Sequence, residues 1–210
     1  MSTNHRLQLP LTEDAVRSLR AADLVYLDGE IVITAGLPTH QRIVQHIDAG
    51  QALPIDLTGA VLLHFGGYSR EVDGKLEVVY MNPTTSTRFI PYMPKIIRTF
   101  GLRAVGGKGG LDTESARAMQ ATGCVYLSFP GGLCTLYSDA IREVTAVGWQ
   151  DLLLHYRLVK LRVAGLGPAT VGIDAHGNSL YDDLQAQAAG RLERIMESLN
   201  ADRGKSVPKP

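Results

Sequence analysis

The stretch from Leu102 to Gly132, LRAVGGKGGLDTESARAMQATGCVYLSFPGG, repeats one order of elements: an apolar run, a glycine-rich loop and the start of a helix. The pattern predicts strands over 102–105 and 124–129 and helices over 112–121, capped by Asp112, and 133–144. Strands that alternate with helices are typical of a parallel sheet. We therefore expect one α/β domain around a partly parallel sheet.

The flanking segments add helices, strands and hairpins to this core. Asp28-Gly29 and Asp73-Gly74 predict two antiparallel hairpins, because Asp-Gly favours a two-residue turn. The domain is expected to span residues 1–202, and the polar, proline-containing segment 203–210 is expected to be a disordered tail. The other expected elements are helices over 12–20, 38–48, 91–100 and 180–199 and strands over 61–65, 158–163 and 169–173.

Composition narrows the classes of function. The chain has 210 residues, of which 21 are basic and 21 acidic, so its formal net charge is zero. A balanced charge removes the electrostatic basis for general binding to nucleic acids or membrane surfaces, and no partner of either kind is expected. The sequence contains no apolar run long enough to span a bilayer and no recognisable signal peptide, so we expect a cytoplasmic protein.

The chain has two cysteines, Cys124 and Cys134. This number is too small for a disulfide scaffold, a four-thiolate zinc site or a self-contained iron–sulfur cluster. We expect two reduced thiols and no metal bound by this chain alone.

Two loops have the residue types that bind small anions. After Pro83, the run Thr84-Thr85-Ser86-Thr87 offers hydroxyl groups and Arg88 offers a bidentate fork for a carboxylate. The alternative is an ordinary capped turn with a surface arginine. The second loop is Gly106-Gly107-Lys108-Gly109-Gly110. Its glycines let the backbone approach a ligand closely, and the side chain of Lys108 is the one cation that projects from it. Gly109 stands where a P-loop requires Ser or Thr, so this is not a nucleotide-binding P-loop.

His40, at the start of the helix expected over 38–48, is a candidate proton carrier or carboxylate donor. The alternative is a surface or half-buried histidine with no chemical role. The other histidines have no partners at a recognisable spacing.

In their order and spacing, these segments resemble the β-subunit, or C-terminal domain, of class I fumarases and L(+)-tartrate dehydratases, which are iron–sulfur hydro-lyases. The resemblance covers residues from about 22 to 181. It implies a swivelling β/β/α fold with a mixed, partly parallel sheet and antiparallel hairpins. The matching motifs are Asp23–Gly29, His40 with Arg42, Pro83–Ser86 with Arg88, Gly107–Gly110 and Gly172–Leu180.

The resemblance also implies a function. The chain would be one subunit of a two-chain lyase that hydrates or dehydrates a small hydroxydicarboxylate, in a hetero-oligomer or homodimer. A larger α-subunit would carry the 4Fe–4S cluster. The residues that match the family's catalytic residues are Thr84, the candidate base, Lys108 and His40. The expected substrate-binding residues are Arg88, Thr85, Ser86, Lys108, Gly107 and Gly109.

Two segments depart from the family pattern. Gly36 and Leu37 stand where the family usually has Arg-Asp, and residues 152–156 also differ. Loss of a guanidinium at a carboxylate site removes a contact worth roughly 1.5–3 kcal/mol. The chain therefore resembles a divergent member, and two other functions stay open: a non-catalytic carboxylate- or phosphate-binding module, and a cluster-free enzyme with Lys108 and His40 as acid and base.

Overall fold

The computed structural model describes residues 3–205. Within them, seven strands form one sheet in the order β1-β2-β3-β6-β7-β9-β8. Strands β4 and β5 form a separate two-stranded sheet. The strands are β1 (Asn4–Gln8), β2 (Leu24–Ile33), β3 (Val61–Leu63), β4 (Phe65–Val72), β5 (Lys75–Pro83), β6 (Ala104–Gly107), β7 (Val125–Ser128), β8 (Ile141–Gly148) and β9 (Leu158–Ile173). The helices are α1 (Glu13–Ser18), α2 (Leu37–Asp48), α3 (Met93–Phe100), α4 (Thr113–Thr122), α5 (Cys134–Asp139) and α6 (Leu180–Lys205), with short 3₁₀ helices η1 (Ser86–Phe89) and η2 (Leu154–Tyr156).

The large sheet is mixed and closes on itself. Strands β1, β2, β3, β6 and β7 pair in parallel. Strand β9, which is 16 residues long, pairs antiparallel with β7 and β8 and also with β2. Because β9 reaches both β7 and β2, the row of strands between them forms a closed ring. The predicted α/β class, with a partly parallel sheet and an antiparallel hairpin, is confirmed.

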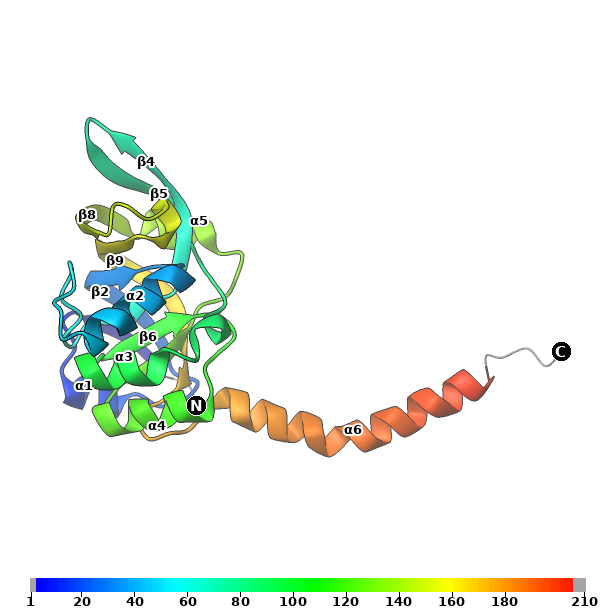
Figure 1. Cartoon of the computed structure of the whole chain (residues 1–210). Coiled ribbons are helices and arrows are strands. Elements are labelled where there is room, and N and C mark those ends of the chain that lie inside the picture. The colour runs from blue at the N-terminus through cyan, green and yellow to red at the C-terminus, as the bar shows by residue number, and fades with distance from the viewer. Residues whose placement is uncertain (1–2, 206–210) are drawn as a thin grey trace.

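Alternating side chains divide the interior into two cores. Val61 and Leu63 of β3 belong to one core and Leu62 to the other, as the two-residue period of a strand requires. The first core fills the closed sheet. The second lies between the sheet and helices α2, α3 and α4, which line one side of it (Figure 1).

The hairpin predicted at Asp28-Gly29 is wrong, because β2 runs through both residues as one strand. The Asp28 carboxylate accepts hydrogen bonds from Arg6 at 2.6 and 2.9 Å and from the Gly165 amide at 2.8 Å. Gly29 has φ 122°, and the β2–β9 register shifts between Leu27 and Gly29. The Asp-Gly pair therefore marks a bulge in a strand and not a chain reversal.

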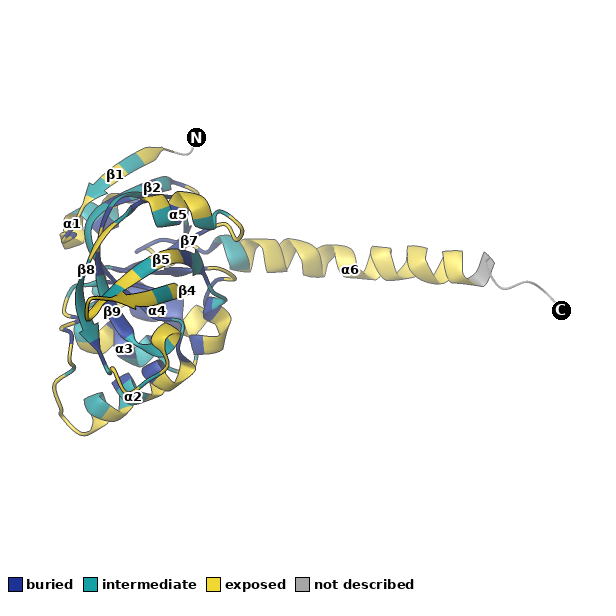
Figure 2. Ribbon diagram, turned by 90° about the horizontal axis from the view of Figure 1, so that it is seen from above, coloured by how far each residue is buried: buried dark blue, intermediate teal, exposed yellow. Residues whose placement is uncertain are grey.

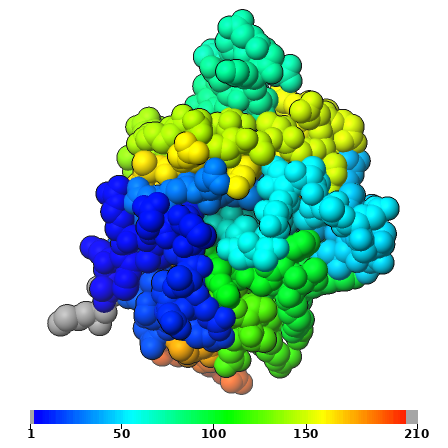
Figure 3. All heavy atoms as spheres, turned by 90° about the vertical axis from the view of Figure 1, so that its left-hand side faces the viewer, coloured from blue at the N-terminus to red at the C-terminus, as the bar shows by residue number. Residues whose placement is uncertain are grey.

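The helix predicted over 133–144 is wrong in its second half, since α5 ends at Asp139 and β8 begins at Ile141. Antiparallel pairing with β9 overrides the local helical pattern. The strands predicted over 158–163 and 169–173 are joined into β9, which continues through Gly165 at φ 70°. The hairpin predicted at Asp73-Gly74 is confirmed and protrudes from the body (Figures 1 and 3).

The last helix extends further than predicted. Helix α6 continues to Lys205, past the start of the predicted tail, and residues 206–210 of that tail lie outside the described part of the chain. Nearly all of α6 is exposed (Figure 2). Within residues 3–205, no helix has the length and apolar character that crossing a membrane requires.

Candidate functional site

The candidate residues gather where parallel strands β3 and β6 end. His64 follows β3, Lys108 follows β6, and the segment Thr84–Arg88 follows β5 beside them. In α/β sheets, ligands bind beyond the carboxyl ends of parallel strands. The two anion-binding loops expected from the sequence therefore lie at the edge where a site is expected.

These two loops are joined through their backbones. The Lys108 amide donates to the Thr84 carbonyl at 3.0 Å, and the Ser86 amide donates to the Lys108 carbonyl at 2.7 Å. A parallel β-bridge pairs Thr85 with Lys108. The loops need a glycine here, because a Cβ atom on Gly107 would lie 2.3 Å from Ser86 Oγ and 3.0 Å from the Thr84 carbonyl oxygen.

Two exposed cations stand on the joined loops. The Arg88 guanidinium donates to Thr84 Oγ1 at 2.5 Å and to the Thr85 carbonyl at 3.4 Å, and it lies 5.3 Å from the centre of the Phe89 ring. Lys108 extends toward Gly131, where a Cβ atom would be 3.7 Å from its Nζ. Among the residues that the structure describes, no carboxylate forms an ion pair with Arg88 or Lys108. Their charge is therefore available to an anion.

Beneath Arg88 lie two fully buried histidines whose rings contact Phe89 and each other. His40 stacks on the Phe89 ring with centroids 4.0 Å apart and an angle of 11°, and its ring centre is 5.1 Å from that of His64. Nδ1 of His40 donates to the Gly36 carbonyl at 2.7 Å. Within residues 3–205, Nε2 of His40 and Nε2 of His64 have no hydrogen-bond partner.

A chain of hydrogen bonds holds His64. The Gly110 amide donates to the Tyr126 hydroxyl at 3.3 Å, and this hydroxyl donates to Ser86 Oγ at 2.8 Å. Ser86 Oγ lies 2.8 Å from His64 Nδ1. Because Ser86 Oγ accepts the Tyr126 proton, the serine hydroxyl donates its own proton to this nitrogen. This direction places the imidazole proton of His64 on Nε2, whereas His40 has its proton on Nδ1 and a lone pair on Nε2.

Both histidines are neutral at pH 7. Burial lowers the pKa of His40 to about 4, and the charge of Arg88 lowers it as well, against the hydrogen bond to Gly36. Burial also lowers the pKa of His64 well below its ordinary value, with further contributions from His40 and Arg88. Neither imidazole therefore adds positive charge beneath the guanidinium.

The structure brings together all the residues singled out from the sequence: Thr84, Thr85, Ser86, Arg88, Gly107, Lys108, Gly109 and, below them, His40. Ser86 is fully buried, and its hydroxyl is bound to Tyr126 and His64. Sequence reasoning missed His64 and Tyr126. The available signal for His64 was its position directly after the buried run Val61–Leu63, at the end of a parallel strand.

The two segments that depart from the family pattern are in contact with each other. The Ala35 amide donates to the His155 carbonyl at 3.3 Å, and the Thr39 hydroxyl donates to the Tyr156 carbonyl. A Cβ atom on Gly36 would lie 3.0 Å from Tyr156 Cα. The Thr39 hydroxyl of α2, which would be 2.2 Å from this Cβ atom, and Tyr156 of η2 thus both occupy the space that a side chain at position 36 would enter.

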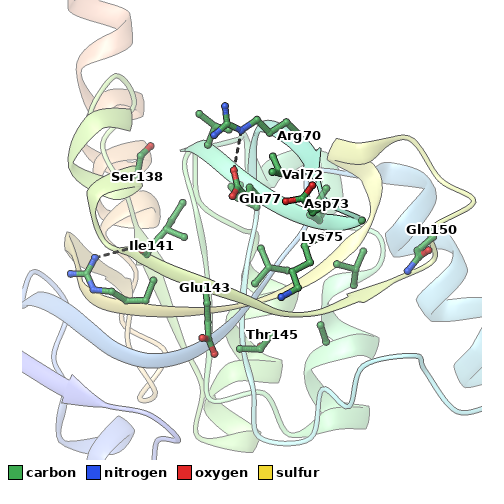
Figure 4. Close-up of a pocket in the computed structure, with 18 residues that line it drawn as sticks. Arg70, Val72, Asp73, Lys75, Glu77, Ser138, Ile141, Glu143, Thr145 and Gln150 are labelled. Atoms are coloured by element: carbon green, nitrogen blue, oxygen red, sulfur yellow. Dashed lines mark hydrogen bonds and ion pairs between the residues drawn. The ribbon is translucent and has the colours of Figure 1, made fainter.

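A large surface cavity, about 950 Å³, lies away from these residues, between the β4–β5 hairpin and β8 (Figure 4). Its charged lining residues have both signs, and Arg70 pairs with Glu77 across the hairpin at 2.9 Å. None of the candidate site residues lines it.

Among known protein families, the one described as Fumarase C-terminus matches residues 2–184 of this chain. A provisionally named class I fumarate hydratase of Geobacillus stearothermophilus is 35% identical over 192 residues, which are 91% of this chain and 36% of that protein. A provisionally named L(+)-tartrate dehydratase subunit beta of Methanocaldococcus jannaschii is 31% identical, over 89% of this chain and 95% of its own length. The L(+)-tartrate dehydratase subunit beta of Escherichia coli K12 is 30% identical, over 92% of this chain and 94% of its own length. The chain thus spans about a third of the first relative and nearly all of the other two.

Replacing Ser86 tests the hydrogen-bond chain. The variant Ser86→Ala leaves buried Nδ1 of His64 and the Tyr126 hydroxyl without their partner, so the free energy of unfolding should fall by about 1–3 kcal/mol. Urea denaturation measures the change. Thr87→Ala, at the exposed neighbouring position, is the control and should change it by less than about 0.5 kcal/mol. Equal stabilities of the two variants would contradict the assignment.

Acidification tests the buried state of His40. Because its folded pKa is about 4 against 6.5 in the unfolded chain, the unfolded state binds more protons between these values. Stability from this group is therefore complete above pH 6.5 and falls as the pH drops toward 4, by roughly 3 kcal/mol in total.

Urea unfolding of the wild type and of His40→Gln across pH 4–7.5 measures this contribution as the difference between the two slopes. The glutamine amide does not titrate, so the variant should lose less stability on acidification. Parallel pH dependences would show that His40 is not buried as a neutral imidazole.

Proposed function

The chain belongs to the fumarase C-terminus family, and on this premise we propose that it is the β-subunit of a hydro-lyase that adds water to, or removes it from, a small hydroxydicarboxylate. The proposal covers both reaction types that the names of the relatives record, hydration of fumarate and dehydration of L(+)-tartrate.

One observation carries the proposal: Arg88 and Lys108 stand on loops that are bonded to each other, and both are exposed without a carboxylate partner among residues 3–205. A dicarboxylate has two negative ends, and each can take a charge-assisted hydrogen bond from one cation. Arg88 offers a planar fork and Lys108 a point charge, so the two ends would be bound in different geometries. Thr85 and Gly109 line the same junction.

Thr84 is the proposed base that removes the proton next to a substrate carboxylate. A hydroxyl is a poor base at its ordinary pKa, so its negative form needs stabilisation. Arg88 supplies this, because its guanidinium donates a hydrogen bond directly to Thr84 Oγ1. For Thr84 to act as the base, its hydroxyl proton first passes to solvent water, and the resulting alkoxide then takes the substrate proton and returns to the hydroxyl form.

His40 is proposed to act by position and not by carrying a proton. Its ring is fully buried, and its pKa of about 4 leaves it neutral under physiological conditions. Stacked on Phe89, it holds the ring over which the Arg88 guanidinium lies. Loss of His40 would therefore disturb Arg88 before it disturbs any proton transfer.

The iron–sulfur cluster of this family does not fit the thiols of this chain. The chain has two cysteines, and Cys124 is buried in the core behind the sheet. A 4Fe–4S cluster is held by more cysteine thiolates than this chain has. We assign the cluster to a larger α-subunit, the partner that the β-subunit names of the relatives imply.

The fumarate hydratase relative supports this division, because nearly two thirds of that protein has no counterpart in this chain. A separate α-subunit would supply the missing part, in a hetero-oligomer that we place in the cytoplasm.

Gly36 stands where the family usually has an arginine, so this chain lacks one charge-assisted contact that a substrate carboxylate would receive. A Cβ atom at position 36 would lie 2.2 Å from Thr39 Oγ1 and 3.0 Å from Tyr156 Cα, so a side chain there would require both neighbours to shift. The second candidate function is therefore a non-catalytic module that binds small carboxylates or phosphate through Arg88 and Lys108.

Replacing each cation tests the proposed function. Arg88→Ala and Lys108→Ala should each lower kcat/KM by roughly 10- to 160-fold, the effect of losing one charge-assisted contact of about 1.5–3 kcal/mol. The assay is anaerobic turnover of a panel of hydroxydicarboxylates by the chain co-expressed with its larger subunit. Both residues are exposed, so the urea midpoint should not change.

Lys75→Ala, an exposed lysine at the tip of the β4–β5 hairpin, is the matched control and should leave kcat/KM unchanged. Unaltered kinetics in both site variants would remove the carboxylate assignment. Substrate binding that depends on both cations, without turnover by the wild-type complex, would identify the second candidate function.

A further inference from the structure

Helix α6 leaves the body of the protein and is exposed along nearly all its length (Figures 1 and 2). The family match ends at residue 184, whereas the helix continues to Lys205. Tyr181, in its first turn, is the part of the helix that packs on the body, where a Cβ atom on Gly110 or Gly172 would meet the tyrosine ring. The remainder is an extension that the common fold of the family does not require.

One face of this extension is apolar. The residues of this stripe are Leu184, Ala188, Leu192, Ile195 and Leu199. Their spacing of three or four residues places them in one row along the helix. The four large side chains are 63%, 59%, 48% and 47% exposed in chain order. A continuous apolar surface of this kind marks a protein contact and not an ordinary solvated helix.

We propose that α6 pairs with α6 of a second copy of this chain, antiparallel, through the stripe. A two-fold axis halfway between Leu192 and Ile195 places each Leu192 opposite Ile195 of the other copy and each Ala188 opposite Leu199. The small Ala188 then faces the large Leu199 at each end of the Leu192–Ile195 layers, which allows the close packing of two helices. A parallel pair in register would set Ala188 against Ala188 and leave a gap between layers of leucine.

The directions of the two helices agree with this arrangement. In an antiparallel pair the positive end of each helix dipole lies beside the negative end of the other, so the dipoles attract each other. The two bodies sit at opposite ends of the helix pair, and one two-fold axis relates the two copies.

The pairing is independent of the proposed function. The stripe begins beyond Tyr181, and none of the residues around Arg88 and Lys108 belongs to it. Experiments can therefore support or contradict the proposed dimer without deciding the proposed function, and the reverse.

The mass of the full chain in solution is the first test. Sedimentation and light scattering over rising concentration should give a mass approaching twice the 22.7 kDa of one chain. The double variant Leu192→Glu/Ile195→Glu should stay at the mass of one chain. Ala186→Glu/Ala201→Glu is the matched control, since it adds the same two charges at exposed positions on the opposite face of α6, and it should remain dimeric.

Cysteine cross-linking tests the direction of pairing, in a Cys134→Ser background under a mild thiol oxidant. An equal mixture of the single variants Ala188→Cys and Leu199→Cys should give a covalent dimer that joins the two different variants. Cross-linking of Ala188→Cys with itself would indicate a parallel pair and overturn the proposal.

A wild-type chain that remains a monomer at all concentrations would also overturn the proposal. If Leu192→Glu/Ile195→Glu then abolished binding to the co-expressed larger subunit, the stripe would be assigned to that subunit in place of a second copy.

Discussion

The close approach of the backbone at Gly107 to Ser86 is the contact on which the candidate site depends. A single added carbon at position 107 would collide with Ser86 Oγ, so the loops after β5 and β6 meet only because no side chain intervenes. The same approach permits the backbone hydrogen bonds between Thr84, Lys108 and Ser86, and it places the serine hydroxyl between Tyr126 and His64. Backbone geometry therefore sets the relative position of two cations that are far apart in sequence.

The layer below the cations consists of uncharged polar rings in an apolar environment. His40 and His64 both contact Phe89 and are both neutral, so Arg88 has no like charge beneath it. A fully aliphatic layer would pack as well but would offer no hydrogen bond to Ser86. The two unpartnered Nε2 atoms, one a donor and one an acceptor, leave this layer with hydrogen-bonding capacity that the described protein groups do not use.

Features set by neighbouring residues could be predicted from the sequence: the Asp112 cap, the helix that begins near Pro38 and the hairpin at Asp73-Gly74. Features set by pairing with distant strands could not. The Asp28-Gly29 bulge and the change from α5 to β8 both depend on β9, which follows much later in the chain. For the site, the loops were recognisable as anion-binding from their residue types, and their functional roles came from the family resemblance. The Tyr126–Ser86–His64 chain was beyond prediction, because it joins three segments that only tertiary packing brings together.

The closing of the sheet by β9 has a consequence for biosynthesis. Strands β2 and β7 are translated well before Leu158–Ile173, yet both pair with that segment. The ring is thus sealed by nearly the last part of the domain to leave the ribosome. Until then the apolar interior residues of β2 are open on one side, and the nascent chain has an unpaired strand edge, which is a template for pairing with another chain. The closed sheet of this domain can therefore form only after β9 has left the ribosome.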